Sequence, residues 1–175
     1  WKIKVTRVPA IDGATLPLGL NESIKPAEIG CLASHVSILI DMLKNGFKTI
    51  LILEDDVDFH EQWRSKLVDS LNILPSNWDM FYLGARHVEE PERLNDYLYK
   101  VNNALTTSSY AITADYARKI LPEMKKLQKQ VDLIYSENQR ANNVYASRPC
   151  LAWQRGDFSD VLDENSCYTQ YFKMY

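Results

Sequence analysis

Residues 49–59, TILILEDDVDF, combine a short apolar run with a cluster of acidic residues. Ile50 to Leu53 form an uninterrupted apolar run, which predicts a strand buried on both faces in a mostly parallel sheet. The run ends abruptly on Glu54, Asp55 and Asp56. Ligands of open α/β sheets bind just outside the carboxyl ends of the strands, so the position of these acids predicts a binding site.

The acidic residues at this strand end predict a site for a divalent cation. Neighbouring carboxylates raise one another's pKa unless a cation cancels their charge, and hard cations prefer oxygen ligands. Side chains alternate along an extended chain, so Glu54 and Asp56 are expected on one side and Asp55 on the other. The alternative is a solvated acidic turn in which Asp58 caps the next helix.

Length and composition indicate one globular domain over residues 1–175, with 46% hydrophobic and 25% charged residues. A net charge of -3 argues against nucleic acid as the main partner. No transmembrane segment is expected, because Ser37 and Asp41 interrupt the longest apolar candidate. The chain begins at Trp1 rather than Met, and we expect it to be an excerpt or a processed form.

The three cysteines, Cys31, Cys150 and Cys167, are an odd number without C-x-x-C spacing. This pattern predicts neither a disulfide framework nor a zinc site. Cys31 lies in a helical pattern and is expected to be a small buried side chain. Whether Cys150 and Cys167 pair stays open.

Periodicity and turn residues predict an alternation of strands and helices, and hence an α/β sandwich. The predicted helices cover residues 26–44, 61–73, 114–127 and 130–142. The predicted strands cover residues 2–8, 50–53, 79–83, 97–101, 144–147 and 150–154, whereas residues 106–112 are polar and then apolar and are assigned to no element. Residues 86–95 are expected to form a mobile loop and residues 156–160 a turn. Gly84 is expected where a backbone approaches a ligand closely.

The segments AEIGCLASHVSIL and ILILEDDVDF together resemble the core signature of glycosyltransferase family 25. That family includes bacterial lipooligosaccharide galactosyltransferases and collagen hydroxylysine galactosyltransferases. WDMFYLG, SSYAITADYARKIL, VDLIY, RPCLAWQRGDFSDV and TRVPAIDG resemble further family segments, so the likeness covers most of residues 6–161 in order. Two features depart from the family pattern: an initial strand with Asn-Leu-x-x-Arg is missing, and Ser108-Ser109 replaces a His-Gly.

The resemblance implies a Rossmann-like nucleotide-sugar transferase fold of the GT-A type, with Glu54-Asp55-Asp56 in the role of the metal motif. It implies Mn²⁺ or Mg²⁺ on Asp56 and Glu54, a UDP-sugar donor, and inverting transfer of a hexose, with galactose expected, to a hydroxyl. Asp132 is the expected general base, and a base of this kind contributes about 10²–10⁴-fold. Asp160 is its substitute, or else a second contact for the metal or the diphosphate. Asp132 as a plain helix cap is the alternative. The expected donor contacts are Asp55, Ser34, His35 and Glu28, and the expected acceptor contacts are Tyr110, Gln154 and Asp157.

Oligosaccharide, glycolipid and hydroxylysine acceptors all stay open. The compartment also stays open. The cytoplasm, including a peripheral position on a membrane, is slightly favoured over the endoplasmic reticulum lumen. A degenerate transferase fold kept as a binding or structural module is one alternative function. The other is a Mg²⁺-binding phosphoreceiver domain, which needs an acid after a later strand, whereas Leu83-Gly84 stands there.

Overall fold

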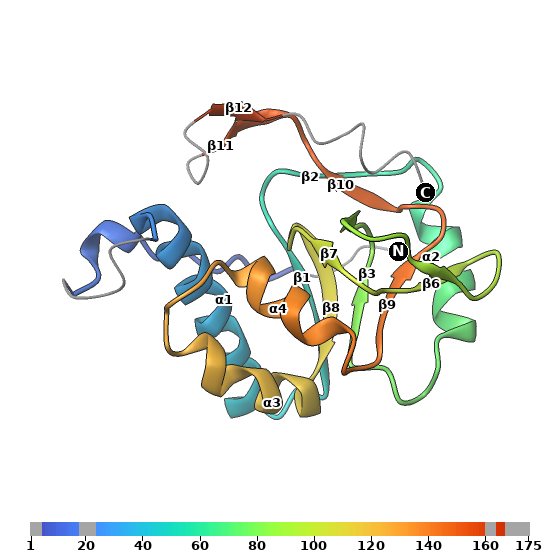
Figure 1. Ribbon diagram of the computed structural model, residues 1–175, viewed down its shortest axis with the longest axis horizontal. Coiled ribbons are helices and arrows are strands. Elements are labelled where there is room, and N and C mark those ends of the chain that lie inside the picture. Colours follow the sequence, from blue (N-terminus) through green and yellow to red (C-terminus); the bar gives the residue numbers. More distant parts are fainter. Residues whose placement is uncertain (1–4, 18–23, 160–163, 167–175) are drawn as a thin grey trace.

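The computed structural model describes residues 5–17, 24–159 and 164–166. At its centre lies a six-stranded sheet (Figure 1). Its strands follow the order β1 (Thr49–Leu53), β8 (Ser109–Thr113), β3 (Met80–Tyr82), β9 (Val144–Ser147), β6 (Leu98–Lys100) and β5 (Glu92–Arg93). Helices α1 (Pro26–Lys44), α3 (Ala114–Met124) and α4 (Val131–Gln139) pack on one face, and α2 (Trp63–Ile73) packs on the other. The predicted α/β class is confirmed.

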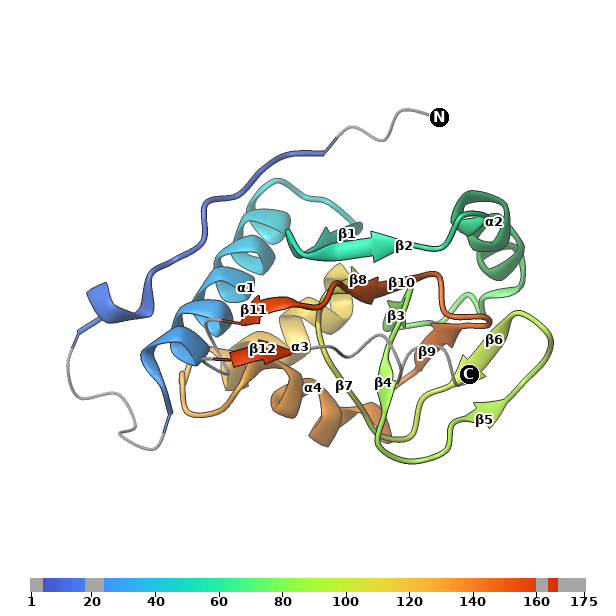
Figure 2. The ribbon, with the colours of Figure 1, turned by 90° about the horizontal axis from the view of Figure 1, so that it is seen from above.

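Three two-stranded pairings and one short helix complete the described structure. The pairings join β2 (Val57–Phe59) to β10 (Ala152–Gln154), β4 (Arg86–His87) to β7 (Ala104–Leu105), and β11 (Asp157–Ser159) to β12 (Glu164–Ser166). The short helix is η1 (Gly13–Thr15), which lies against α1. Figure 1 shows the β2–β10 pair and the β11–β12 pair in the upper part of the molecule, above the main sheet, and Figure 2 views the molecule from that side.

The prediction of a mostly parallel sheet is wrong. Only β3 and β9 run parallel in the described sheet, while β1–β8, β3–β8, β6–β9 and β5–β6 are antiparallel. The apolar run in β1 predicts a strand buried on both faces, but β1 lies at one end of the described sheet, and Leu51 is 37% exposed whereas Ile52 is 5% exposed. A short apolar run therefore determines neither the direction of its neighbouring strands nor the burial of both its faces.

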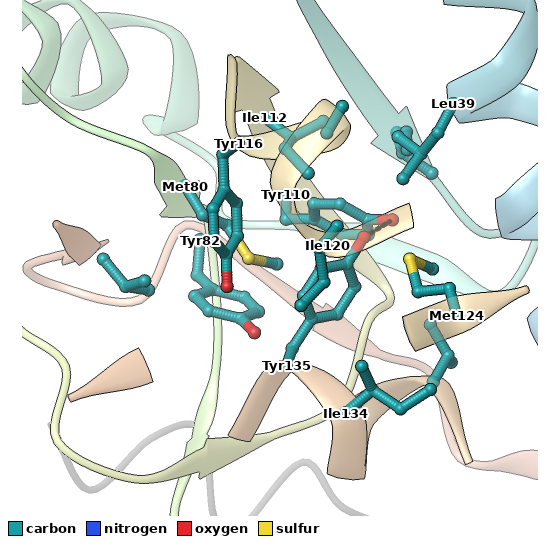
Figure 3. Packing of buried hydrophobic residues seen from close by; sticks show 14 of the residues in the cluster. Leu39, Met80, Tyr82, Tyr110, Ile112, Tyr116, Ile120, Met124, Ile134 and Tyr135 are labelled. Carbon is teal, nitrogen blue, oxygen red and sulfur yellow. Dashed lines mark hydrogen bonds between the residues drawn. The ribbon is translucent and has the colours of Figure 1, made fainter. Parts of the chain in front are cut away.

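Alternation along β3 divides the interior into two cores. Met80 and Tyr82 face the core under α1, α3 and α4, whereas Phe81 and Leu83 face a second core that contains Trp63 of α2. Figure 3 shows tyrosines filling much of the first core. Tyr110 and Tyr135 meet there at their hydroxyls, 3.3 Å apart, and both rings are fully buried.

Helix α1 forms as its sequence predicts. Pro26 opens it, the Glu28 carboxylate accepts from the Lys25 N–H at 3.0 Å, and Gly46 follows its end with a φ of 69°. By length and composition alone α1 could cross a membrane, but its Leu32 and Leu39 side chains are fully buried in the core. Core helices of globular domains commonly combine these two properties.

Five local predictions need correction. Residues 5–8 form no strand, and residues 1–4 lie outside the described part. The expected mobile loop at 86–95 contains β4 and β5, the expected turn at 156–160 contains β11, and α4 ends at Gln139. Gly84 approaches protein backbone rather than a ligand, since a Cβ placed on it would lie 1.7 Å from the Ala152 carbonyl oxygen. Closely packed β3 and β10 therefore require this glycine.

Candidate functional site

The acidic segment lies where the chain leaves the main sheet. Glu54 extends the β1–β8 ladder, because its N–H donates to the Ser108 carbonyl at 2.9 Å. Asp55 and Asp56 then form a turn, and β2 pairs with β10 instead of with the sheet. Asp58 lies inside β2, and α2 begins only at Trp63, so the alternative of Asp58 as a helix cap is wrong.

Glu54 is held as a carboxylate by neighbours from two other elements. Its Oε1 accepts from the Thr107 hydroxyl at 2.8 Å and lies 3.3 Å from Nε2 of His35, on α1. Burial acts to raise the pKa of Glu54, but the hydrogen bond and charge of His35 and the Thr107 hydroxyl bring it below its usual value. The negative form of Glu54 is therefore the stable one at neutral pH.

Asp56 differs from Glu54 because one of its carboxylate oxygens is buried without a hydrogen-bond partner among the described residues. Its Oδ2 accepts from Nε2 of Gln154 at 2.7 Å, whereas its Oδ1 is buried with no hydrogen-bond partner among the described residues. Burial raises the pKa of Asp56, the Gln154 hydrogen bond opposes this, and the charges of Glu54 and Asp55 raise it further. A buried carboxylate oxygen without a partner, beside two more acids, fits a cation ligand.

Asp132 occupies the first turn of α4 and is the third acid at this site. Its Oδ2 accepts from the Thr106 N–H at 3.4 Å, at a residue with a φ of 76°. Burial raises the pKa of Asp132, the N–H groups of Thr106 and Leu133 and the charge of Arg86 lower it, and the charge of Glu54 raises it. A carboxylate that burial makes more basic is suited to accept a proton.

The thiol of Cys31 lies within electrostatic reach of three acids, Glu54, Asp56 and Asp132. Burial raises the pKa of this thiol to about 12, and the charges of Glu54, Asp132 and Asp56 add to the rise. One side chain on α1 is thus within electrostatic reach of carboxylates from the β1 end, the acidic turn and α4. Sequence spacing could not show this convergence, because these elements are distant along the chain.

Several predicted site residues have structural partners in the fold. The Ser34 hydroxyl accepts from the Ile11 N–H and donates to the Gly30 carbonyl, both at 2.8 Å. Glu28 caps α1 and accepts from Gln130 Nε2 at 2.5 Å. Tyr110, predicted as an acceptor contact, is fully buried with its hydroxyl 2.7 Å from Nδ1 of His35. The correction is that Tyr110 supports His35 and offers no surface to an acceptor.

The other predicted residues are placed differently. Asp55 is exposed in the turn, where it is open to a ligand. Gln154, predicted as an acceptor contact, donates to the Asp56 carboxylate and therefore lies at the acidic turn. Asp157 lies in β11, but its side chain is outside the described part, as is all of Asp160. The roles predicted for these two acids therefore stay predictions.

Thr107 is the site residue that sequence reasoning missed. It follows β7 and precedes β8, and it is 6% exposed. The signal available for it was the polar run TTSS directly before the apolar part of a strand, next to a strand end that carries acids.

Comparisons with known proteins relate this chain to glycosyltransferases. Residues 19–95 match the sequence profile of "Glycosyltransferase family 25 (LPS biosynthesis protein)". A "Glycosyltransferase 25 family member" of Anopheles gambiae is 33% identical over 104 residues, which are 55% of this chain and 17% of the relative. Human "Procollagen galactosyltransferase 2" is 28% identical over 145 residues, 69% of this chain and 23% of the relative. A mouse "Inactive glycosyltransferase 25 family member 3" is 26% identical over 147 residues, 69% of this chain and 25% of the relative.

The chain therefore spans about a quarter or less of these relatives. Among solved structures, mannose-1-phosphate geranyltransferase from Thermus thermophilus matches with a TM-score of 0.47 and 14% identity, over 69% of this chain and 50% of that one. Likeness at this level says nothing about function.

The phosphoreceiver alternative requires an aspartate that can be phosphorylated at the end of a later strand. Strand β3 is instead followed by Leu83 and Gly84, so the required acid is missing there.

Proposed function

We propose that this chain, which matches the profile of glycosyltransferase family 25 over residues 19–95, acts as a member of that family. In this proposal it transfers a hexose, galactose in the first instance, from a UDP-sugar to a hydroxyl group with inversion at the anomeric carbon. The single observation that carries the proposal is Asp56 Oδ1, a buried carboxylate oxygen without a partner in the described part of the chain. A nucleotide-sugar fold of the GT-A type is part of the same proposal.

The donor side of the site would be formed by the acidic turn. Asp56 and Glu54 would hold Mn²⁺ or Mg²⁺, which when bound supplies positive charge to the diphosphate as the glycosidic bond breaks. Gln154 fixes one oxygen of Asp56 and leaves the other open, while His35 and Thr107 keep Glu54 ionised. Asp55, exposed in the turn, would bind ribose or sugar hydroxyls.

The acceptor side would depend on Asp132. Its raised pKa makes it a stronger base than an ordinary aspartate, and it would take the proton from the acceptor hydroxyl during attack on the anomeric carbon. It lies in the first turn of α4, within electrostatic reach of Glu54. Asp160 remains the substitute for this role. An oligosaccharide, a glycolipid or hydroxylysine would supply the hydroxyl.

The test is calorimetric titration with UDP in the presence and absence of Mn²⁺. We expect Mn²⁺-dependent binding by the native chain and at least about 100-fold weaker binding by Asp56→Asn, since even outer-shell changes at metal sites cost about 10–100-fold. Asp58→Asn is the matched control, because Asp58 is two residues away on β2 with 46% side-chain exposure. Equal binding by the native chain and Asp56→Asn would remove the assignment of the metal.

A second candidate, a binding or structural module without transfer activity, is favoured by the mouse relative whose name calls it inactive. The two candidates differ in one product. Native chain incubated with UDP-galactose, Mn²⁺ and an acceptor should release UDP, and Asp132→Asn should slow this release by about 10²–10⁴-fold. Mn²⁺-dependent UDP binding without any release in the presence of each acceptor class would instead indicate the module.

A further inference from the structure

Helix α1 and the end of β1 bring three different metal-binding atoms together. Cys31 and His35 are four residues apart on α1 and therefore lie on one face of the helix. Glu54 meets them from the strand end, so that Cys31 Sγ, His35 Nε2 and a Glu54 carboxylate oxygen lie within 4.8 Å of one another. The cation assigned above to Asp56 uses neither the thiol nor the imidazole.

We propose that Cys31, His35 and Glu54 form a second metal site, which binds Zn²⁺ or a chemically similar ion. Thiolate sulfur, imidazole nitrogen and carboxylate oxygen are the ligands of protein zinc sites, whereas Mn²⁺ and Mg²⁺ favour oxygen. The proposal goes beyond the proposed function and does not depend on it, because it needs neither a donor nor an acceptor.

The distances allow such an ion with a small adjustment. Zinc bonds to nitrogen and oxygen of about 2.0–2.2 Å and to sulfur of about 2.3 Å place tetrahedral ligands about 3.3–3.7 Å apart. His35 Nε2 and Glu54 Oε1 are already 3.3 Å apart. The pairs that include Cys31 are within 4.8 Å, so they need to close by about 1 Å or slightly more at most. Rotation of the short Cys31 side chain can supply this change.

The surroundings hold two of the three ligands in place. Nδ1 of His35 lies 2.7 Å from the Tyr110 hydroxyl, and the imidazole is 4% exposed and stacked on the Tyr110 ring. A hydrogen-bond partner on the second ring nitrogen is the usual support of a metal-binding histidine. If Nδ1 donates to the Tyr110 hydroxyl, Nε2 carries a lone pair that faces the Glu54 carboxylate. Two electron-rich atoms at this distance need a positive charge between them, and a bound cation supplies it.

The two metal sites would share Glu54 without competing for one atom. Oε1 faces His35 and Thr107, whereas Oε2 has no hydrogen-bond partner among the residues that the structure describes. Oε1 therefore serves the inner ion and Oε2 is left for a cation on Asp56. The negative charges of Asp56 and Asp132, which also act on Cys31, favour a cation at this position.

Cobalt titration of the full chain tests this proposal, because a thiolate bound to Co²⁺ gives a charge-transfer absorption that oxygen and nitrogen ligands do not give. We expect this absorption to saturate at one equivalent and to be removed by Zn²⁺. Cys31→Ser should abolish it, whereas Cys150→Ser, at the other described free cysteine, should leave it unchanged. Tyr110→Phe, which removes the partner of Nδ1, should weaken binding by about 10–100-fold.

A second measurement needs no variant. Zn²⁺ should protect Cys31 of the native chain, but not Cys150, from alkylation as mapped by mass spectrometry. The absence of both the absorption and the protection would overturn the proposal, and so would an absorption that survives in folded Cys31→Ser. Asp56→Asn separates the two sites: it should keep the cobalt absorption while losing Mn²⁺-dependent UDP binding. Loss of both in that variant would mean one shared site and would overturn the second one.

Discussion

Replacement of Gln139 by Leu should destabilise the domain strongly, although Gln139 touches no ligand in our proposals. The side chain is fully buried at the end of α4. It accepts from the Ala104 N–H at 2.7 Å and donates to the Ala104 carbonyl at 2.9 Å and to the Tyr82 hydroxyl at 3.0 Å. Gln139→Leu preserves the approximate volume but leaves three buried polar groups without these partners.

Each such group costs about 1–3 kcal/mol, so the sum of the lower limits predicts a loss of at least about 3 kcal/mol in the free energy of unfolding. Urea unfolding measures this as a fall in the midpoint of about 1 M or more with an unchanged slope. Gln62→Leu is the control: its side chain is exposed and makes no capping bond, so a change within about 0.5 kcal/mol is expected. A loss below about 1 kcal/mol in Gln139→Leu would refute the reasoning.

Two further predictions concern Asp132 and Gly84. Burial raises the pKa of Asp132, so the folded state holds this proton more tightly than the unfolded chain, and native stability falls as the pH rises through the ordinary pKa to the raised one. Asp132→Asn removes this pH dependence of the free energy of unfolding. Urea midpoints measured between about pH 4 and pH 7 should therefore show the variant gaining stability relative to the native chain as the pH rises. The same pH dependence in both proteins would contradict this. Gly84→Ala places a Cβ 1.7 Å from the Ala152 carbonyl oxygen and should cost about 3 kcal/mol or more, so a thermal midpoint that stays unchanged would contradict the close packing.

The sequence predicted the helices better than the sheet, for a physical reason. The three- and four-residue spacing in 26–44 marks one face of a helix, and α1 has these bounds. Strand pairing depends instead on contacts between distant segments, such as β1 with β8 and β3 with β9. Nothing local in TILIL indicates whether its neighbour runs parallel or antiparallel, so the direction of the sheet was not predictable.

The candidate site shows the same division. Glu54 and Asp56 could be recognised because an apolar strand ends on them, and Asp132 because it opens a helix. Thr107 and Gln154 could not be assigned as their partners, since each lies far along the chain from its acid. The zinc site that we propose is invisible to C-x-x-C spacing for the same reason, because its three ligands come from a helix and a strand end rather than from one segment.

The pairing of β2 with β10 also sets an order of events during translation. Gln154 is synthesised 98 residues after Asp56. At about 5–20 residues per second the acidic turn waits roughly 5–20 s for this partner, whereas a hairpin closes in about 1–10 μs. A ribosome paused before Ala152 would therefore carry a nascent chain in which the acidic turn has been synthesised but the Gln154 partner of Asp56 has not. The acidic turn is thus completed by a strand that emerges long after the turn itself.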